Sequence, residues 1–288
     1  MPVSKSRIID YYDSCEIDYR WLWDLKNSRS MHYGFWDSEV SNLGQALLRQ
    51  NDFMADRAGI NGEDRVLDAG CGVGGSALHL ARRFGCSVTG ISISARQIAR
   101  ANQYAIDEGL ADKVEFLERD FTDTGFADES FSVVWAVESV CHAPDKSDFL
   151  REAFRILRPG GRLILCDGFA SREAFEAPDE KLMRRWANGW AVESLESDRA
   201  FRDGAREVGF ENIRYNDITT NILPSSKRLY RLAVPTLIFG RLAQFLRFRT
   251  SVQTQNIVAA RDQYRALRRN LWHYGIFYGE KARSPRPV

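Results

Sequence analysis

The chain has 288 residues, with 40 Lys or Arg against 39 Asp or Glu and a formal net charge of +1. This even balance gives no electrostatic attraction for nucleic acid, so we expect no nucleic-acid partner. No apolar run reaches the roughly 18 residues that a transmembrane helix needs, and the polar residues 1–10 do not resemble a secretory signal. The length allows one large domain or one domain with a cap.

The five cysteines are scattered along the chain and include no C-x-x-C pair. Three of them, Cys71, Cys86 and Cys166, lie in or beside apolar segments, where a thiol behaves as a small hydrophobic side chain. We therefore expect free thiols in the reducing cytoplasm, and neither a disulfide framework nor a metal site.

The N-terminal part of the chain is expected to be mostly helical and is rich in aromatic residues. Residues 11–36 contain eight aromatic side chains, more than a small helical cap needs for packing alone. In one interpretation Tyr33 and Trp36 point inward to a ligand, while Trp21 and Trp23 pack the cap. In the alternative the segment is only a hydrophobic docking helix.

The run VLDAGCGVGG, residues 66–75, joins an expected strand to an expected helix. Asp68 ends the apolar stem, and glycines at 70, 72, 74 and 75 then lead into the helix. Glycine adopts positive φ without strain and lets a ligand contact bare backbone. A strand, a glycine turn and a helix N-terminus together form a cradle for a nucleotide, with backbone N–H groups directed at the ligand.

The glycine spacing alone does not identify the nucleotide. Gly70, Gly72 and Gly75 also satisfy the G-x-G-x-x-G dinucleotide pattern. That pattern expects an acidic residue about 20 positions on, whereas the next expected strand runs into Ser92 without one. Asp68 would repel a pyrophosphate but could meet a cationic amino group. These two details disfavour a dinucleotide.

A D-x-G-x-G-x-G run after the first strand resembles motif I of the class I S-adenosylmethionine (SAM) dependent methyltransferases. The resemblance implies SAM as the cofactor, with Asp68, Gly70, Gly72 and Gly74 among the residues that bind it. The resemblance covers the chain from about residue 30 to residue 280 and is most specific at residues 65–75, 91–97 and 134–161.

Three later segments fit the same family. ISISARQ, after the second expected strand, resembles the branch with sterol, tocopherol and cyclopropane-fatty-acid methyltransferases, which implies ribose contacts from Gln97 and Ser92. The family places an adenine-binding acid and a ring-packing neighbour after the third strand, which match Asp120 and Phe121. The backbone of Ala136 and Val137, at the end of the fourth strand, is expected to line the cofactor. A solvent-facing Gln97 and an ordinary loop at Asp120 are the structural alternatives.

The segment VWAVESVCHAP, residues 134–144, resembles the AIEATCHAP-like signature of sterol methyltransferases. Glu138 is our candidate catalytic residue, because a carboxylate can stabilise the carbocation that C-methylation of an alkene forms, or steer the proton that leaves. His142 would be the general base if the acceptor atom were oxygen or nitrogen. The structural alternatives are a supporting or helix-capping Glu138 and a structural His142.

Two aromatic groups are expected to form the acceptor pocket. Residues 30–36, SMHYGFW, resemble the MHHGYY-like element of tocopherol methyltransferases, which implies that Tyr33 and Trp36 lie over the cofactor and the acceptor. Aromatic faces attract cations, so such a lid suits a sulfonium and a carbocation alike. Trp186 and Trp190 follow the fifth expected strand, a common place for acceptor-specific insertions.

Strands and helices alternate between residues 65 and 167 at the pitch of βαβ units, which predicts a parallel sheet covered on both faces. With two later strands, we expect an α/β, doubly wound, Rossmann-like fold with a seven-stranded, mostly parallel sheet and helical N-terminal and C-terminal caps. The expected strands are Arg65–Ala69, Ser87–Ile91, Val114–Glu118, Phe131–Ala136, Gly161–Asp167, Phe210–Ile218 and Leu271–Gly279. The expected core helices are Gly75–Phe84, Ser94–Glu108 and Lys146–Leu157.

We divide the chain into three parts: the aromatic-rich cap at 1–60, the SAM-binding core at 61–170, and inserted lid helices with the last strands at 171–288. Within the third part, residues 229–248 are strongly apolar and carry arginines. They could form a lid over an apolar substrate, an oligomer contact or a membrane-surface helix, the last being disfavoured. Pro235 would kink a helix there and favours a lid or a helix pair.

The sequence predicts a SAM-dependent methyltransferase that acts on a hydrophobic small molecule, first of all at carbon of an isoprenoid or prenyl group, as in a secondary metabolite, sterol or prenylquinone. O- or N-methylation of a natural product such as a polyketide, with His142 as base, is the alternative. A non-catalytic SAM-binding partner protein is the alternative from another class. The C-terminal helices depart from those of sterol methyltransferases, so the acceptor cannot be carried over, and a homo-oligomer is left open.

Overall fold

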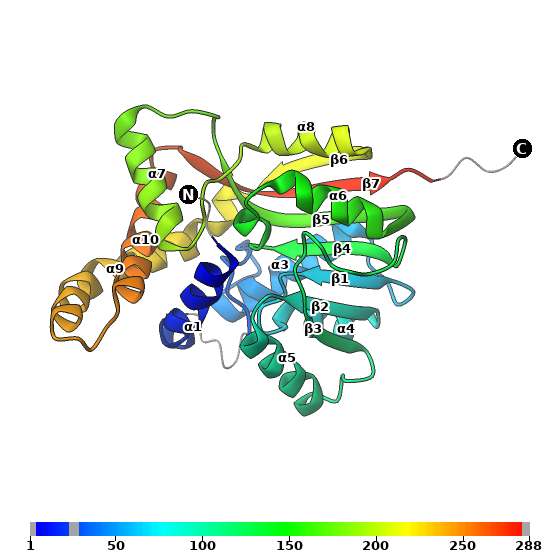
Figure 1. Cartoon of the computed structure of the whole chain (residues 1–288), viewed down its shortest axis with the longest axis horizontal. Coiled ribbons are helices and arrows are strands. Elements are labelled where there is room, and N and C mark those ends of the chain that lie inside the picture. The colour runs from blue at the N-terminus through cyan, green and yellow to red at the C-terminus, as the bar shows by residue number, and fades with distance from the viewer. Residues whose placement is uncertain (1–3, 23–28, 284–288) are drawn as a thin grey trace, which may run out of the picture.

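The computed structural model describes residues 4–22 and 29–283, which form one seven-stranded sheet with helices on both faces (Figure 1). The strand order is β3-β2-β1-β4-β5-β7-β6, and β7 alone runs antiparallel to its neighbours. The strands are β1 (Arg65–Ala69), β2 (Ser87–Ser92), β3 (Val114–Glu118), β4 (Phe131–Val137), β5 (Leu157–Ala170), β6 (Phe210–Asp217) and β7 (Trp272–Lys281). The predicted fold class is confirmed.

Helices cover both faces of the sheet, as the alternation of elements predicts. One face packs against α3 (Leu43–Ala58), α4 (Gly75–Phe84) and α5 (Ala95–Asp107). The other face packs against α6 (Lys146–Ile156) and α8 (Asp198–Val208). Each helix turns an apolar stripe to the sheet, and burial of these stripes is the main favourable contribution to folding.

The two central strands, β1 and β4, are buried on both sides. Val66 and Val133 point to the first core, whereas Leu67 and Val134 point to the second. Successive side chains of a strand point to opposite faces, so a strand that is buried on both faces has a continuous apolar sequence. This is why the two strands lack the polar alternation of a half-exposed sheet.

Four further helices lie beyond the end of the sheet at which the parallel strands finish (Figure 1). They are α1 (Lys5–Leu22), α7 (Ala177–Gly189), α9 (Thr219–Phe245) and α10 (Ser251–Leu267). Helix α10 packs against α1, α7 and α9, and the α9–α10 hairpin projects away from the sheet. Trp23 and the side chain of Trp21 lie outside the described residues, so their expected role in packing the cap remains a prediction.

The structure departs from the sequence-based expectations in two elements. Strand β5 begins at Leu157 and reaches Ala170, because Leu157 pairs with Phe131 and the antiparallel ladder with β7 continues to Ala170. Helix α9 begins ten residues before the apolar segment 229–248 and continues through Pro235. It pairs with α10, and a helix pair is one of the two arrangements that Pro235 favours.

Phe116 of β3 fills a space that two glycines leave open. A Cβ at Gly74, the N-cap of α4, would lie 2.6 Å from Cζ of this ring, and a Cβ at Gly90 in β2 would lie 2.5 Å from its Cδ1. Gly74 also has φ of 88°, a conformation that costs other residues free energy. Both glycines are therefore needed for the start of α4 to sit against the sheet.

We expect Gly90→Ala to lower the free energy of unfolding by about 1–3 kcal/mol, because the added methyl group overpacks the site of the Phe116 ring. Thermal or urea unfolding followed by circular dichroism measures the change. Gly62→Ala is the matched control, because its nearest neighbour would be the Phe84 carbonyl oxygen at 3.4 Å. Equal stability of the two variants would contradict the packing argument.

Candidate functional site

The glycine loop after β1 is held against two neighbouring strands. The backbone N–H groups of Gly70 and Cys71 both donate to the carbonyl of Ile91 in β2, at 2.9 Å. On the other side, the Ser139 hydroxyl, just after β4, donates to the carbonyl of Ala69 at 2.6 Å. A Cβ at Gly70 would lie 2.3 Å from Cβ of Ser139, so only glycine fits between these partners.

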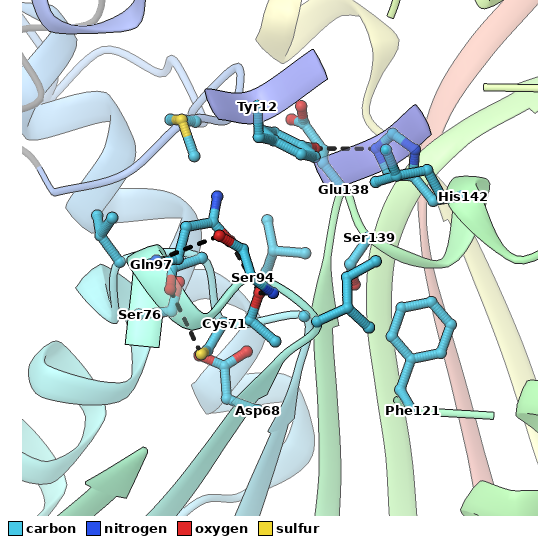
Figure 2. Close-up of a pocket in the computed structure, with 18 of the residues that line it drawn as sticks. Tyr12, Asp68, Cys71, Ser76, Ser94, Gln97, Phe121, Glu138, Ser139 and His142 are labelled. Atoms are coloured by element: carbon cyan, nitrogen blue, oxygen red, sulfur yellow. Dashed lines mark hydrogen bonds between the residues drawn. The ribbon is translucent and has the colours of Figure 1, made fainter. Parts of the chain in front are cut away.

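A cavity opens beside this loop at the carboxyl ends of the parallel strands (Figure 2). It encloses about 1130 Å³ of empty space, part of which is open to solvent. Ligands of open α/β sheets bind at this end, where the strand order reverses between β1 and β4. Nine of the expected site residues line this first cavity: Asp68, Gly70, Gly72, Ser92, Gln97, Asp120, Phe121, Glu138 and His142.

Two of the expected cofactor residues do not line the first cavity. Gly74 packs on Phe116, as described above. Ala136 of β4 is buried in the core on the face of α6, and its neighbour Val137 lines the cavity instead. The alternation of side chains along β4 explains the difference, since adjacent residues face opposite sides of the sheet.

Asp68 carries a carboxyl oxygen without a hydrogen-bond partner in the described part of the chain, its Oδ2. The side chain is buried, and burial raises its pKa to about 7, although the backbone N–H of Ala77 donates to it and opposes the shift. A buried carboxylate that lacks a partner is costly unless a ligand supplies one. A cationic amino group fits this position.

Ser92 and Gln97 form one polar unit on the wall of the first cavity. The Ser92 hydroxyl donates to Oε1 of Gln97 at 2.8 Å, and Ser94, the N-cap of α5, accepts from the Gln97 backbone N–H. The Gln97 amide nitrogen is left to donate to a ligand. The pair therefore offers hydroxyl and amide groups of the kind that a ribose would need.

Asp120 is bound to the N-terminal helix. Its Oδ1 accepts from the backbone and the hydroxyl of Thr122, both at 2.8 Å, and its Oδ2 forms an ion pair with Lys5 of α1. Burial acts to raise the pKa of this carboxyl, but the bonds from Lys5 and Thr122 outweigh it and hold the pKa below its usual value. Helix α1 thus closes one end of the cavity, a contact that sequence analysis did not predict.

A second cavity, of about 730 Å³, adjoins the first. The two share Tyr12, Met31, Glu138 and His142 in their linings. Aromatic residues from the cap elements and β7 form much of the remaining wall: Tyr11, Tyr19, Tyr33, Trp186, Trp190, Trp272 and Tyr274. The structure thus brings together three of the four expected substrate residues, Tyr33, Trp186 and Trp190.

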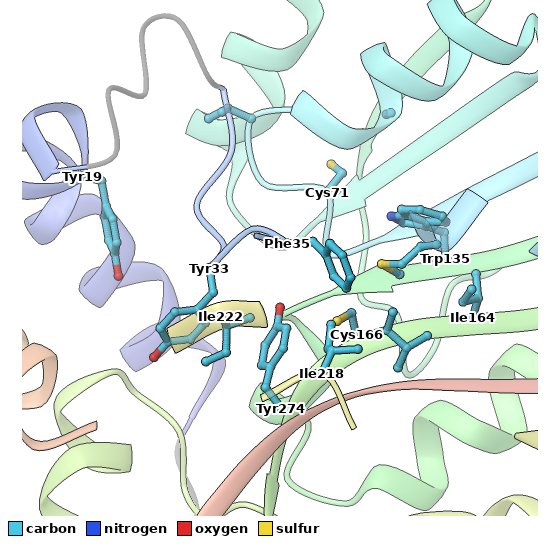
Figure 3. Close-up of a cluster of buried hydrophobic side chains, with 14 of the residues drawn as sticks. Tyr19, Tyr33, Phe35, Cys71, Trp135, Ile164, Cys166, Ile218, Ile222 and Tyr274 are labelled. Carbon is cyan, nitrogen blue, oxygen red and sulfur yellow. The ribbon is translucent and has the colours of Figure 1, made fainter. Parts of the chain in front are cut away.

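Trp36, the fourth expected substrate residue, lines neither cavity. Its indole nitrogen donates to the Ser225 hydroxyl at 2.8 Å, and its backbone exchanges hydrogen bonds with Asn221. Trp36 therefore holds the N-terminal segment on α9, and Tyr33 reaches the cavity in its place. Figure 3 shows Tyr33 beside Tyr274, whose ring centre lies 5.5 Å away.

Glu138 lies at the junction of the two cavities in a strained backbone conformation. Its φ is 49°, which is unusual for a residue other than glycine, and such strain is often found at functional sites. Its Oε1 accepts from the Tyr33 backbone N–H at 2.8 Å and from the Tyr274 hydroxyl at 2.6 Å. Burial outweighs these bonds and raises the pKa to about 8, so the carboxyl is mostly protonated near neutral pH.

His142 is a buried, neutral imidazole whose tautomer follows from its partners. Its Nδ1 lies 3.2 Å from the carbonyl oxygen of Ala191, which can only accept, so Nδ1 carries the proton. Nε2 then has the free electron pair and accepts from the Tyr12 hydroxyl at 2.9 Å (Figure 2). Burial lowers the pKa of His142 to about 4. Nε2 is therefore unprotonated at the junction over the physiological pH range, where it accepts from Tyr12.

Three residues of the second cavity were missed by sequence analysis. Tyr12 forms a hydrogen bond with His142, and Tyr274 forms one with Glu138. Asp167, near the end of β5, accepts from the backbone N–H groups of Cys141 and Gly168. Burial raises the pKa of Asp167. Its position at the carboxyl end of a parallel strand was a signal that could have found it, whereas the two tyrosines had no motif of their own.

Known proteins resemble both the core and the whole fold. Residues 67–165 match a family described as a methyltransferase domain. The 27-O-demethylrifamycin SV methyltransferase of Amycolatopsis mediterranei is 38% identical over 206 residues, 71% of this chain and 75% of the relative. The sterol 24-C-methyltransferase of Eremothecium gossypii is 33% identical over 75% of this chain and 59% of its own length.

A solved structure of geranyl diphosphate C-methyltransferase from Streptomyces coelicolor A3(2), in complex with Mg²⁺, geranyl diphosphate and S-adenosyl-L-homocysteine, has a TM-score of 0.74. The two sequences are 22% identical, and the match covers 98% of this chain and 100% of the other. At this identity the likeness shows a shared fold. The fold and the cavity at its switch point define a nucleotide-type cofactor site. The chain belongs to the SAM-dependent methyltransferases, and it is an enzyme that uses SAM.

Among the residues that the structure describes, none of the helices has the length and apolar character needed to span a membrane.

Proposed function

We propose that the enzyme methylates a hydroxyl oxygen of a hydrophobic, oxygenated small molecule bound in the second cavity. SAM supplies a methyl group on a sulfonium, and the first cavity has the groups to hold it. Asp68 would accept from its amino group and the Ser92–Gln97 pair would bind its ribose, while Asp120 and Phe121 would contact its adenine. The unpartnered Oδ2 of Asp68 is the observation that supports this assignment.

The lining of the second cavity supports an acceptor that is apolar but carries oxygen atoms. The aromatic rings provide most of its surface. The indole N–H groups of Trp186 and Trp190, however, are buried and find no hydrogen-bond partner among the described residues. Buried donors are normally satisfied, so a ligand with oxygen acceptors would complete them. An oxygenated natural product meets this requirement better than a bare hydrocarbon chain.

The position of His142 is the reason that we propose oxygen as the methylated atom. Its Nε2 electron pair is directed at a hydroxyl already, that of Tyr12, at the junction of the cavities. An acceptor hydroxyl that takes the place of the Tyr12 hydroxyl would give its proton to Nε2 while its oxygen forms the new bond to the methyl carbon. The bond from that carbon to the sulfonium sulfur would break, and S-adenosylhomocysteine would be the leaving group. General-base catalysis of this kind contributes typically about 10²- to 10⁴-fold in rate. Enclosure by the aromatic walls would exclude water.

Methylation at carbon is the second candidate, because Glu138 lies at the same junction. A carboxylate there could take the proton that leaves a carbocation, as the sequence led us to expect for an isoprenoid acceptor. The raised pKa of Glu138 makes this role less favourable, since a protonated carboxyl cannot accept a proton.

The placement of four of the five cysteine thiols in the interior supports the expected reducing compartment.

We expect Asp68→Asn to weaken SAM binding by about 10- to 100-fold, because a charge-assisted hydrogen bond contributes about 1.5–3 kcal/mol. Wild-type affinity should fall as the pH drops through about 7, where the carboxyl becomes protonated, and the variant should lose this dependence. Isothermal titration calorimetry measures both effects. Asp123→Asn, an exposed residue at the same end of the sheet, is the control. Unaltered affinity and pH dependence in Asp68→Asn would contradict the assignment.

His142→Gln should lower kcat with a hydroxylated acceptor by about 10²- to 10⁴-fold and leave SAM affinity unchanged. Because burial lowers the pKa of His142 to about 4, its basic form persists above that pH. The wild-type rate should therefore show no acid limb near 6.5 and should fall only toward pH 4. His79→Gln, at the Asp52 ion pair, is the control. A rate limb near 6.5, or near-normal turnover of His142→Gln, would refute the role.

Glu138→Gln separates the two candidates, because the amide oxygen can still accept from Tyr33 and Tyr274. Oxygen methylation by His142 should survive within a few-fold, whereas carbon methylation through Glu138 should lose most of its rate. The raised pKa of Glu138 favours its protonated form in the fold, so its contribution to stability is lost as pH rises from about 4.5 through about 8. The variant should consequently melt at a higher temperature than wild type above pH 8. Loss of turnover with every hydroxylated acceptor would favour the second candidate.

A further inference from the structure

The outer part of the α9–α10 hairpin carries most of the exposed apolar side chains in residues 4–22 and 29–283. Nine large apolar side chains are exposed in all, and seven of them lie between Leu232 and Phe248. Ile238 and Phe239 are 74% and 71% exposed, and Phe245 and Phe248 are each 83% exposed. Single exposed apolar residues are common, but a contiguous group of this kind marks an interaction surface.

This group, which we call the hairpin tip (residues 232–248), is neither core nor lid. Ala233 and Leu237 turn inward, and a Cβ at Gly240 would lie 3.2 Å from Cδ1 of Ile257 on α10. The opposite face of α9 is bare, and Figure 1 shows the hairpin projecting from the body of the protein. None of the tip side chains that the structure describes lines the first or the second cavity. Of the three alternatives that the sequence left open for residues 229–248, this exposure favours an oligomer contact or a membrane-surface contact over a lid.

Most of the hairpin carries charges of one sign, because its one acidic residue, Asp262, is buried near the end of α10. From Ile218 to Arg261 the sequence holds seven Lys or Arg and no Asp or Glu, although acidic and basic residues balance in the chain as a whole. Arg231 and Arg247, beside the bare apolar face, are exposed. Arg249 forms an ion pair with Asp18 of α1, which fixes the base of the loop to the cap.

We propose that the hairpin tip binds the surface of an anionic lipid bilayer. The phenyl and aliphatic side chains would enter the boundary between headgroups and acyl chains, and the arginines would lie against lipid phosphates. A second copy of the chain is a poorer partner, because a symmetric contact would bring the same basic segment of both copies together without acidic residues to offset it. This binding is at the surface and does not depend on the proposed methylation.

The experiment is flotation of the full-length enzyme with vesicles of phosphatidylglycerol and phosphatidylcholine, compared with vesicles of phosphatidylcholine alone. We expect the enzyme to float with the anionic vesicles and to be released as the salt concentration rises. Phe239→Ser/Phe245→Ser/Phe248→Ser should abolish flotation. Arg231→Gln/Arg247→Gln should weaken partitioning by about fivefold for each arginine removed, since one basic residue near such a surface contributes about a factor of five.

The matched control is Leu48→Ser/Ile106→Ser, which removes the two exposed large apolar side chains outside the tip and should float like wild type. SAM affinity, measured on every variant, shows that the fold is intact. Failure of the wild type to float, or flotation of the triple serine variant, would overturn the proposal. So would light scattering that shows a dimer which the triple variant separates into monomers, because the tip would then be an interface between copies.

Discussion

The contact between the glycine loop and the residue that follows Glu138 is the constraint on which the site depends. Parallel pairing sets Asp68 of β1 opposite Trp135 of β4, so the two strands end side by side. Ser139 then binds the carbonyl of Ala69 and leaves room only for glycine at position 70. Glu138 is thereby held in its left-handed conformation, from which its carboxyl reaches the cap.

Three buried acids with raised pKa values lie near the ends of neighbouring parallel strands: Asp68, Glu138 and Asp167. Their burial opposes ionisation, so the folded protein bears a cost that a well-placed cation or proton donor can relieve. Ligand binding at the first cavity should for this reason also stabilise the fold. The basic nitrogen of His142 lies in the same enclosure, where it stays neutral.

The cap helix α1 covers part of the first cavity and reaches its junction with the second. Lys5 of α1 holds Asp120 at one end of the first cavity, and Tyr12 of the same helix holds His142 at the junction. Since both contacts come from one helix, a movement of α1 would open both cavities together. The α9–α10 hairpin belongs to the same cap, but its outer face takes no part in the cavities and is free to serve another contact.

Local sequence patterns determined the fold and the cofactor side of the site. Strands β1 and β3 and helix α4 begin and end at the residues that the sequence predicted. The D-x-G-x-G-x-G run lies at the first cavity, as expected for a cofactor loop. These features depend on residues close together in the chain, whose spacing decides secondary structure and turn geometry.

The acceptor side was decided only by the tertiary structure. Tyr12 meets His142 across 130 residues of sequence, and Tyr274 meets Glu138 across 136. Trp36 shows the limit of local reasoning, because its motif suggested a substrate contact while packing on α9 turned it away. Partners so distant in sequence have no fixed spacing. The Ala191 carbonyl sets the tautomer of His142, and burial raises the pKa of Glu138. The sequence alone therefore predicted the place of the first cavity, where we propose that the methyl donor binds. The fold decided which side chains line the second cavity, the proposed acceptor site.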